Sequence, residues 1–127
     1  MRIRCIGAAL ILPLAFMLCS AVQAMEDPVA ATPGMYKVLH ENDQIRVLEL
    51  VYLPGQQENW HGHPRYLVYV VEPGDGKIKV ENDKGEVHEY DLKLGQNLLT
   101  GPVEKHRGMN PGSSAIRLIA IELKQER

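Results

Sequence analysis

The feature that most constrains the fold is a succession of short, β-branched segments separated by turns that contain glycine and proline. Such segments follow one another about every 8–12 residues, and no window shows a sustained apolar repeat of 3.6 residues with helix caps. The expected strands are residues 36–39, 45–53, 66–71, 77–81, 86–92, 96–100, 104–109 and 115–124. This spacing is typical of an all-β sandwich or barrel, and closure into a barrel removes exposed sheet edges.

The first 24 residues have the pattern of a secretory signal peptide. Arg2 and Arg4 form a positive start, an apolar run follows, and Ala24 ends a cleavage-type sequence. The apolar run is too short to span a bilayer comfortably. We therefore expect cleavage between Ala24 and Met25, a periplasmic or secreted protein, and no membrane attachment after signal removal. Cys19 raises a lipoprotein as an alternative, but the residues before it are not the small ones that a lipobox requires.

The mature chain is predicted to form one domain. Residues 25–34 are small, contain proline and lack a pattern, so we expect a flexible leader before a domain at residues 35–127. Both cysteines, Cys5 and Cys19, lie in the signal peptide, so stability must come from one core, a metal or a partner subunit. The net charge of −2 becomes −4 when Arg2 and Arg4 leave with the signal peptide, and this weak acidity argues against nucleic acid as a partner.

Two histidines lie two residues apart in a strand-like context, in the sequence Gly55-x5-His61-x-His63. Residues i and i+2 of a strand share one face, so both imidazoles can point at the same spot. If His106 from a second strand joins them, three nitrogens converge and form a metal site with open positions. The alternative is a polar pair on an exposed loop.

The spacing of these residues resembles the two motifs of the cupin superfamily. The first motif corresponds to Gly55-x5-His61-x-His63-x3-Leu67-x6-Gly74, and the second to Gly95-x5-Gly101-x-Val103-x2-His106-x3-Asn110. The resemblance covers residues 45–124. The chain is similar to small single-domain bacterial cupins of the Trp-His-x-His type, and distantly to those associated with β-alanine degradation.

The resemblance implies a double-stranded β-helix, or jelly-roll cupin barrel, with a divalent transition metal (Fe, Zn, Mn, Cu or Ni) at its centre. The ligands of the family fall on His61, His63 and His106, whereas Leu67 stands at the position of the usual glutamate ligand. Three neutral histidines leave the charge of the ion uncompensated, which favours anionic ligands. Loss of the glutamate also leaves open that the site has decayed.

Two further residues are candidates, each with a competing explanation. Glu104 would share a strand face with His106, as a replacement carboxylate or as an acceptor for an imidazole N–H, or it is a solvated loop acid. Tyr69 would face the barrel lumen and orient substrate or pass a proton, or it is a core aromatic. We expect His40 and His88 to be surface or ordinary core residues.

The sequence leaves three functions open, the third being a structural jelly roll whose value is its dimer interface. The first is a periplasmic metalloenzyme that acts on a small polar or anionic molecule, by Lewis-acid or dioxygenase-like chemistry. The second is a non-catalytic module that binds a metal or a small ligand through a degenerate site. Long apolar strands at residues 66–71 and 116–123 lead us to expect a homodimer.

Overall fold

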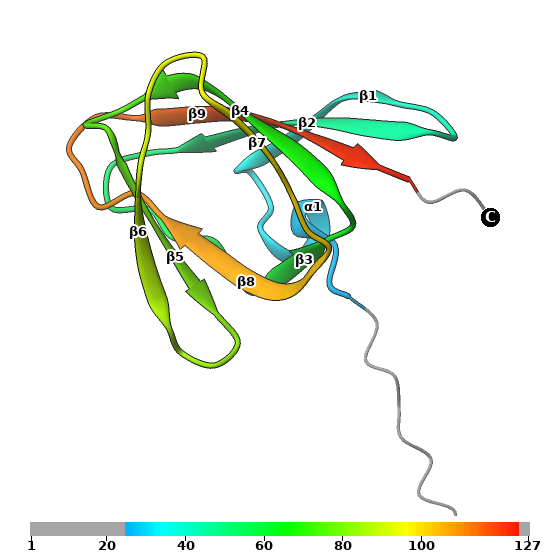
Figure 1. Ribbon diagram of the computed structural model, residues 1–127, viewed down its shortest axis with the longest axis horizontal. Coiled ribbons are helices and arrows are strands. Elements are labelled where there is room, and N and C mark those ends of the chain that lie inside the picture. The colour runs from blue at the N-terminus through cyan, green and yellow to red at the C-terminus, as the bar shows by residue number, and fades with distance from the viewer. Residues whose placement is uncertain (1–24, 125–127) are drawn as a thin grey trace, which may run out of the picture.

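The computed structural model describes residues 25–124, which form two antiparallel β-sheets that face each other (Figure 1). The larger sheet has the order β1-β2-β9-β4-β7 and the smaller sheet β3-β8-β5-β6. The strands are β1 (Tyr36–Glu41), β2 (Ile45–Tyr52), β3 (His61–His63), β4 (Tyr66–Pro73), β5 (Lys77–Asn82), β6 (Val87–Asp91), β7 (Asn97–Thr100), β8 (Val103–Met109) and β9 (Ile116–Leu123). The predicted signal peptide lies outside the described residues.

The predicted all-β, double-stranded β-helix is confirmed. All eight predicted strands are present, and their ends differ from the prediction by at most two residues. The final strand, β9, lies between β2 and β4, and β8 lies between β3 and β5. Strands that are distant in sequence are therefore neighbours in both sheets. This crossing arrangement brings the segment that carries the paired histidines, β3, next to β8.

The core lies between the sheets and follows the alternation of the strands. In β9, Ile116, Leu118 and Ala120 are buried and the residues between them are less covered, as expected for a strand with one face on the core. Leu48 of β2 is completely buried opposite Ala120. The next inward position of β9 holds Glu122, a buried carboxylate. A charge in this register requires partners, because burying an isolated carboxylate is costly.

Residues 25–34, which the sequence predicts as a flexible leader, are ordered and packed. Asp27 caps the short helix α1 (Pro28–Ala31) by accepting a hydrogen bond from the Val29 N–H at 2.8 Å. The same carboxylate pairs with Arg46 of β2 at 2.6 Å. The segment also lies against β3, because the Gly62 N–H donates to the carbonyl of Glu26 at 2.9 Å (Figure 1). These partners are remote in sequence, so the local composition does not reveal them.

The outer face of the larger sheet is partly apolar. Leu67 of β4 and Ile119 and Ile121 of β9 are only half-covered, and Tyr69 is exposed. The homodimer expected from these strands remains a prediction, which sedimentation at micromolar concentration tests. Among residues 25–124, no helix is long and apolar enough to cross a membrane.

Candidate metal centre

Three histidines converge inside the barrel. His61 and His63 lie at the two ends of the three-residue strand β3, and His106 lies directly opposite His61 on β8. One ring nitrogen of each histidine falls within 4.8 Å of those of the other two. The two residues of β3 share one face, as the i, i+2 spacing predicts. The pairing of β3 with β8 then adds the third imidazole.

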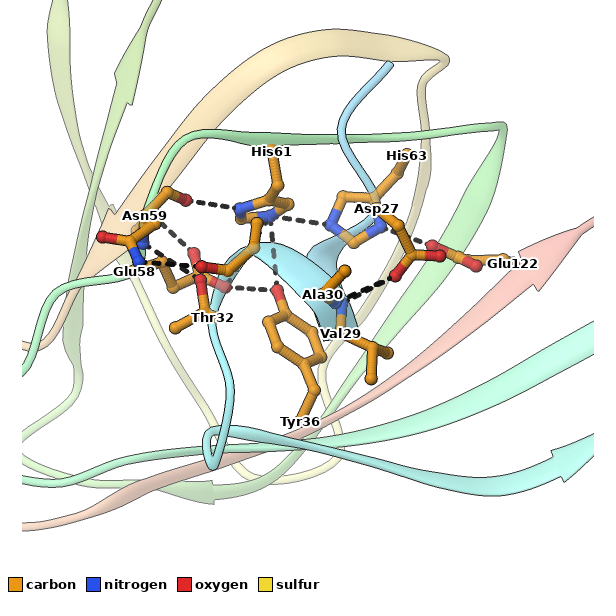
Figure 2. Close-up of polar contacts among 12 residues, drawn as sticks. Asp27, Val29, Ala30, Thr32, Tyr36, Glu58, Asn59, His61, His63 and Glu122 are labelled. Carbon is orange, nitrogen blue, oxygen red and sulfur yellow. Dashed lines mark hydrogen bonds and ion pairs between the residues drawn. The ribbon is translucent and has the colours of Figure 1, made fainter. Parts of the chain in front are cut away.

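Hydrogen bonds fix the orientation of the two rings on β3 (Figure 2). The Nδ1–H of His61 donates to the carbonyl of Asn59 at 2.8 Å, and that of His63 donates to the carboxylate of Glu122 at 2.7 Å. Both acceptors lack a proton, so in each neutral imidazole the free lone pair lies on Nε2. These two Nε2 atoms are 3.1 Å apart. Two lone pairs at this distance repel each other unless a proton or a cation lies between them.

His106 has a ring nitrogen without a partner. Its Nε2 atom is buried and makes no hydrogen bond within the described chain. Burial, together with the nearby His61 and His63, lowers the pKa of His106 to about 3. Burial likewise lowers the pKa of His61. Both rings are therefore neutral near pH 7, with lone pairs free to coordinate, and the donor set fits a transition metal ion.

Glu122 anchors the cluster from the larger sheet. It pairs across β2 and β9 with Arg46, and the two side chains meet at 2.6 Å. Burial alone would raise the pKa of Glu122, but the hydrogen bonds from His63 and Arg46 outweigh burial and hold the pKa below its usual value. Tyr66, opposite Glu122 on β4, stacks on the ring of His63 at a centroid distance of 4.4 Å. A His–carboxylate pair of this kind orients a metal-ligating imidazole and increases its basicity.

A second buried carboxylate, Glu58, lies on the other side of the cluster. It is 3 % exposed, and one of its oxygens lies 3.7 Å from Nε2 of His61. The hydroxyl of Tyr36 donates a short hydrogen bond to Glu58 and lies 3.3 Å from Nε2 of His61 (Figure 2). The Gly108 N–H donates to the other carboxylate oxygen at 2.7 Å. Burial and the charge of Glu58 raise the pKa of Tyr36, so this hydroxyl keeps its proton.

The histidines open into a cavity of about 690 Å3 between the two sheets. Apolar residues from both sheets form most of its walls, including Val68, Ile78 and Leu118. Exposed polar residues such as His88 and Asn97 also contact it and mark its rim. The volume is in the range of small-molecule binding sites. The three imidazoles can therefore meet a ligand that enters from solvent.

The other predicted site residues lie outside this arrangement. Glu104 is exposed and does not line the cavity. Tyr69 is 41 % exposed and points away from the lumen, because the inward positions of β4 are Tyr66, Val68 and Val70. The same alternation turns Leu67 to the outer face, so it does not occupy a ligand position. The geometry therefore gives neither Glu104 nor Tyr69 a role at the histidines.

Four residues near the histidines were missed by the sequence analysis: Tyr36, Glu58, Tyr66 and Glu122. Only Glu122 had a signal in the sequence, since the alternation of β9 places its carboxylate on the same face as Ile116, Leu118 and Ala120. A charged residue in an inward register indicates a buried partner. Glu58 lies in an irregular segment, and nothing local shows that it is buried.

No family model matches this chain, and no curated protein matches it. The fold is nevertheless similar to that of solved structures. A cupin domain from Bordetella pertussis is 24% identical, with a TM-score of 0.65 over 71% of this chain and 92% of that chain.

Two further structures show the same similarity at lower identity. An RmlC-like cupin family protein with a double-stranded β-helix fold, from Methanocaldococcus jannaschii, is 16% identical, with a TM-score of 0.57 over 80% of this chain and 89% of that chain. The Cupin_2 domain of an XRE family transcriptional regulator from Enterobacter cloacae is 18% identical, with a TM-score of 0.53 over 72% of this chain and 96% of that chain.

Proposed function

We propose that this chain, which has the cupin fold, is a metal-binding protein that holds one divalent transition metal ion in its barrel through His61, His63 and His106. The ion would keep positions open toward the cavity, where a small molecule binds. The observation that carries the proposal is the convergence of one ring nitrogen from each of three histidines, together with the buried Nε2 atom of His106, which has no partner within the described chain. Buried polar atoms without partners are rare, and a metal ion would satisfy this one.

The surrounding side chains prepare the site for a cation. Glu122 holds the ring of His63 through Nδ1, and the carbonyl of Asn59 holds the ring of His61 in the same way. The rings are thus oriented before any ion arrives, which reduces the cost of binding. When bound, a divalent ion supplies a Lewis acid that polarises an oxygen of the ligand.

A hydrogen-bonded pair next to the histidines favours catalysis as a second candidate function. The Tyr36 hydroxyl donates a hydrogen bond to Glu58, and the phenol oxygen lies 3.3 Å from a proposed ligand atom of His61. A ligand bound at the open positions would lie near this pair. The phenol oxygen of Tyr36 can then accept a hydrogen bond from a protonated group of the ligand, while Glu58 holds the hydroxyl in position.

Metal analysis of untagged protein tests the proposal. We expect about one transition metal ion per chain in the wild type, and loss of that ion in His106→Ala. His40→Ala is the matched control, because His40 is an exposed histidine on β1 and should leave the metal content unchanged. Equal metal content in wild type and His106→Ala, with both proteins folded, would overturn the assignment.

We also propose export of this protein to the periplasm or the medium. Support comes from the sequence of residues 1–24 alone, with its positive start, apolar run and small residue at Ala24. Mass spectrometry of protein from a periplasmic fraction should give a chain that begins at Met25. An uncleaved chain, or one lipidated at Cys19, would contradict this prediction.

A further inference from the structure

We infer that the ligand of this site is a small molecule with an apolar body and one singly negative oxygen head group, such as a monocarboxylate. This inference rests on the proposed metal function, since the metal would receive the head group. It narrows the small polar or anionic molecule that the sequence suggests to an anion with an apolar body. The difference arises from the cavity walls, which the sequence does not show.

The first argument is the composition of the cavity. Its walls come from the inward faces of both sheets, and several of the lining residues belong to the hydrophobic core, including Leu50, Val70, Ile78 and Leu118. The core therefore contains a cavity next to the three histidines. The walls of this cavity of about 690 Å3 are mostly apolar and open to solvent, and contact between apolar surface and water is unfavourable. An apolar body would remove that surface from water, whereas a polar one would lose its hydration.

The second argument is the absence of cationic side chains. Within residues 25–124, no lysine or arginine lines the cavity. Arg46 is committed to Asp27 and Glu122, and Arg107 pairs with Glu81 and lies over the ring of Trp60 outside the cavity. A second anionic group on the ligand would therefore have no partner along the walls. The two carboxylates that line the cavity are already engaged, because Asp91 pairs with Lys77 and Glu58 accepts hydrogen bonds from Tyr36 and Gly108. A cationic group on the ligand would therefore compete with existing partners, and burial of an unpaired charge is unfavourable.

The third argument is the sum of the charges around the three histidines. Arg46 is shared between Glu122 and the partly exposed Asp27, and Glu58 pairs with no lysine or arginine in the described chain, so nearby carboxylates already offset at least one of the two charges of a divalent ion. At most one unit of positive charge then remains for the ligand, so a head group with more than one negative charge would be unfavourable. Together the three arguments define an amphiphilic ligand, with its head at the histidines and its body along Val68 and Leu118.

The test compares matched ligands on the full chain loaded with Zn2+, by isothermal titration. Acetate, butanoate and hexanoate share one head group and differ in length. We expect the affinity to rise about fourfold for each added methylene that enters the cavity, which corresponds to roughly 0.8 kcal/mol of transfer free energy. Adipate and 4-aminobutanoate place a second charge on chains of the same length, and we expect adipate to bind at least tenfold more weakly than hexanoate, and 4-aminobutanoate at least tenfold more weakly than butanoate.

The outcomes separate the two proposals. If Zn2+ binds but the affinity is flat with chain length, or adipate and 4-aminobutanoate bind as well as hexanoate and butanoate, the inference is wrong and the metal function stands. If Zn2+ does not bind, the metal function fails and the inference fails with it.

A variant that fills the cavity gives an independent measurement. Ala120 is buried on β9 and lines the cavity, so Ala120→Leu should weaken hexanoate binding at least tenfold while acetate and Zn2+ bind as in the wild type. Ile119→Leu, on the outer face of the same strand, is the matched control and should change neither affinity. Hexanoate affinity that is equal in the folded Ala120→Leu protein and the wild type would contradict the placement of the ligand body. The ligand series on the wild type decides the question if Ala120→Leu does not fold.

Discussion

The Nε2 atoms of His61 and His63 lie 3.1 Å apart, while the Nδ1 atom of each ring donates outward to a fixed acceptor. The two acceptors come from different parts of the molecule: the backbone at Asn59, just before β3, and the side chain of Glu122 on β9. The arrangement therefore depends on the two sheets being packed together. Its chemical consequence is a pair of lone pairs that face each other, which is favourable only with a positive centre between them.

The carboxylate of Glu122 should contribute to metal affinity through His63. In Glu122→Gln the acceptor of the His63 Nδ1–H is neutral, so the imidazole becomes less basic, and we expect metal affinity to fall about 10–100-fold. Glu49→Gln is the control, because Glu49 pairs with Arg117 on the outer face of the same sheet. Competition with a chelator of known affinity measures both variants. Equal affinities in the two variants would show that Glu122 has only a structural role.

The carboxylate of Glu58 should stabilise the metal-free protein. Glu58→Gln keeps the volume but replaces one acceptor oxygen with an NH2 group, which is a donor, so either the Tyr36 hydroxyl or the Gly108 N–H loses its acceptor. We expect the free energy of unfolding to fall by about 1–3 kcal/mol, measured by urea denaturation of the metal-free protein.

The control for Glu58 is Glu41→Gln, which removes an exposed pair with Lys124. That change should alter the free energy of unfolding by no more than about 0.5 kcal/mol. A Glu58→Gln protein as stable as Glu41→Gln would mean that solvent reaches the Glu58 carboxylate.

Substitutions at two adjacent positions of β4 test which side chain faces the proposed metal site. Val68 lines the cavity, whereas Leu67 lies on the outer face. Val68→Glu should therefore bring a carboxylate toward the cation and increase the rise in melting temperature on metal addition, because the ion compensates a buried charge. Leu67→Glu should show the rise of the wild type. The reverse result would mean that β4 is shifted by one residue in its register.

The tightest part of the core should be at Leu48, which is completely buried. Leu48→Ala leaves a cavity in the core, and we expect a loss of about 2–5 kcal/mol in the free energy of unfolding. Leu94 is 74 % exposed, so Leu94→Ala should cost less than about 0.5 kcal/mol. Urea denaturation of both variants makes the comparison, and similar losses would show that the core is packed elsewhere.

The packing of residues 25–34 against the rest of the domain should depend on pH, because Asp27 pairs with Arg46. Burial acts to raise its pKa, but the hydrogen bonds and charge of Arg46, with the N–H groups of Val29 and Ala30, lower the pKa below the usual 3.8. The stability that Asp27 contributes is therefore present above pH 3.8 and is lost as the pH falls through the lowered pKa.

Asp27→Asn keeps a helix cap and removes the charge that pairs with Arg46. We expect it to lower the free energy of unfolding at pH 7 by no more than about 1 kcal/mol, since the side chain is 45% exposed and solvent screens the pair. The difference from the wild type should shrink below pH 3.8. A difference that stays constant from pH 7 to pH 2 would rule out the ionised pair as its source.

The sequence by itself determined the strands and the histidines. Alternating β-branched segments bounded by glycine and proline predict strands whatever they pack against, because side-chain period and turn chemistry are local properties. The pair at His61 and His63 is local in the same sense, since two residues of one strand must share a face. These parts of the prediction needed no knowledge of the partner strand.

Tertiary structure decided what surrounds the histidines. The positions of Glu58, Glu122 and Tyr36 near the cluster depend on how the two sheets pack, and so does the ordering of residues 25–34 through Arg46. The inward face of β4 is likewise fixed by pairing with β7 and β9, which turned Tyr69 and Leu67 outward. Contacts between residues far apart in the chain arise from the packing of whole sheets, and no local pattern encodes them.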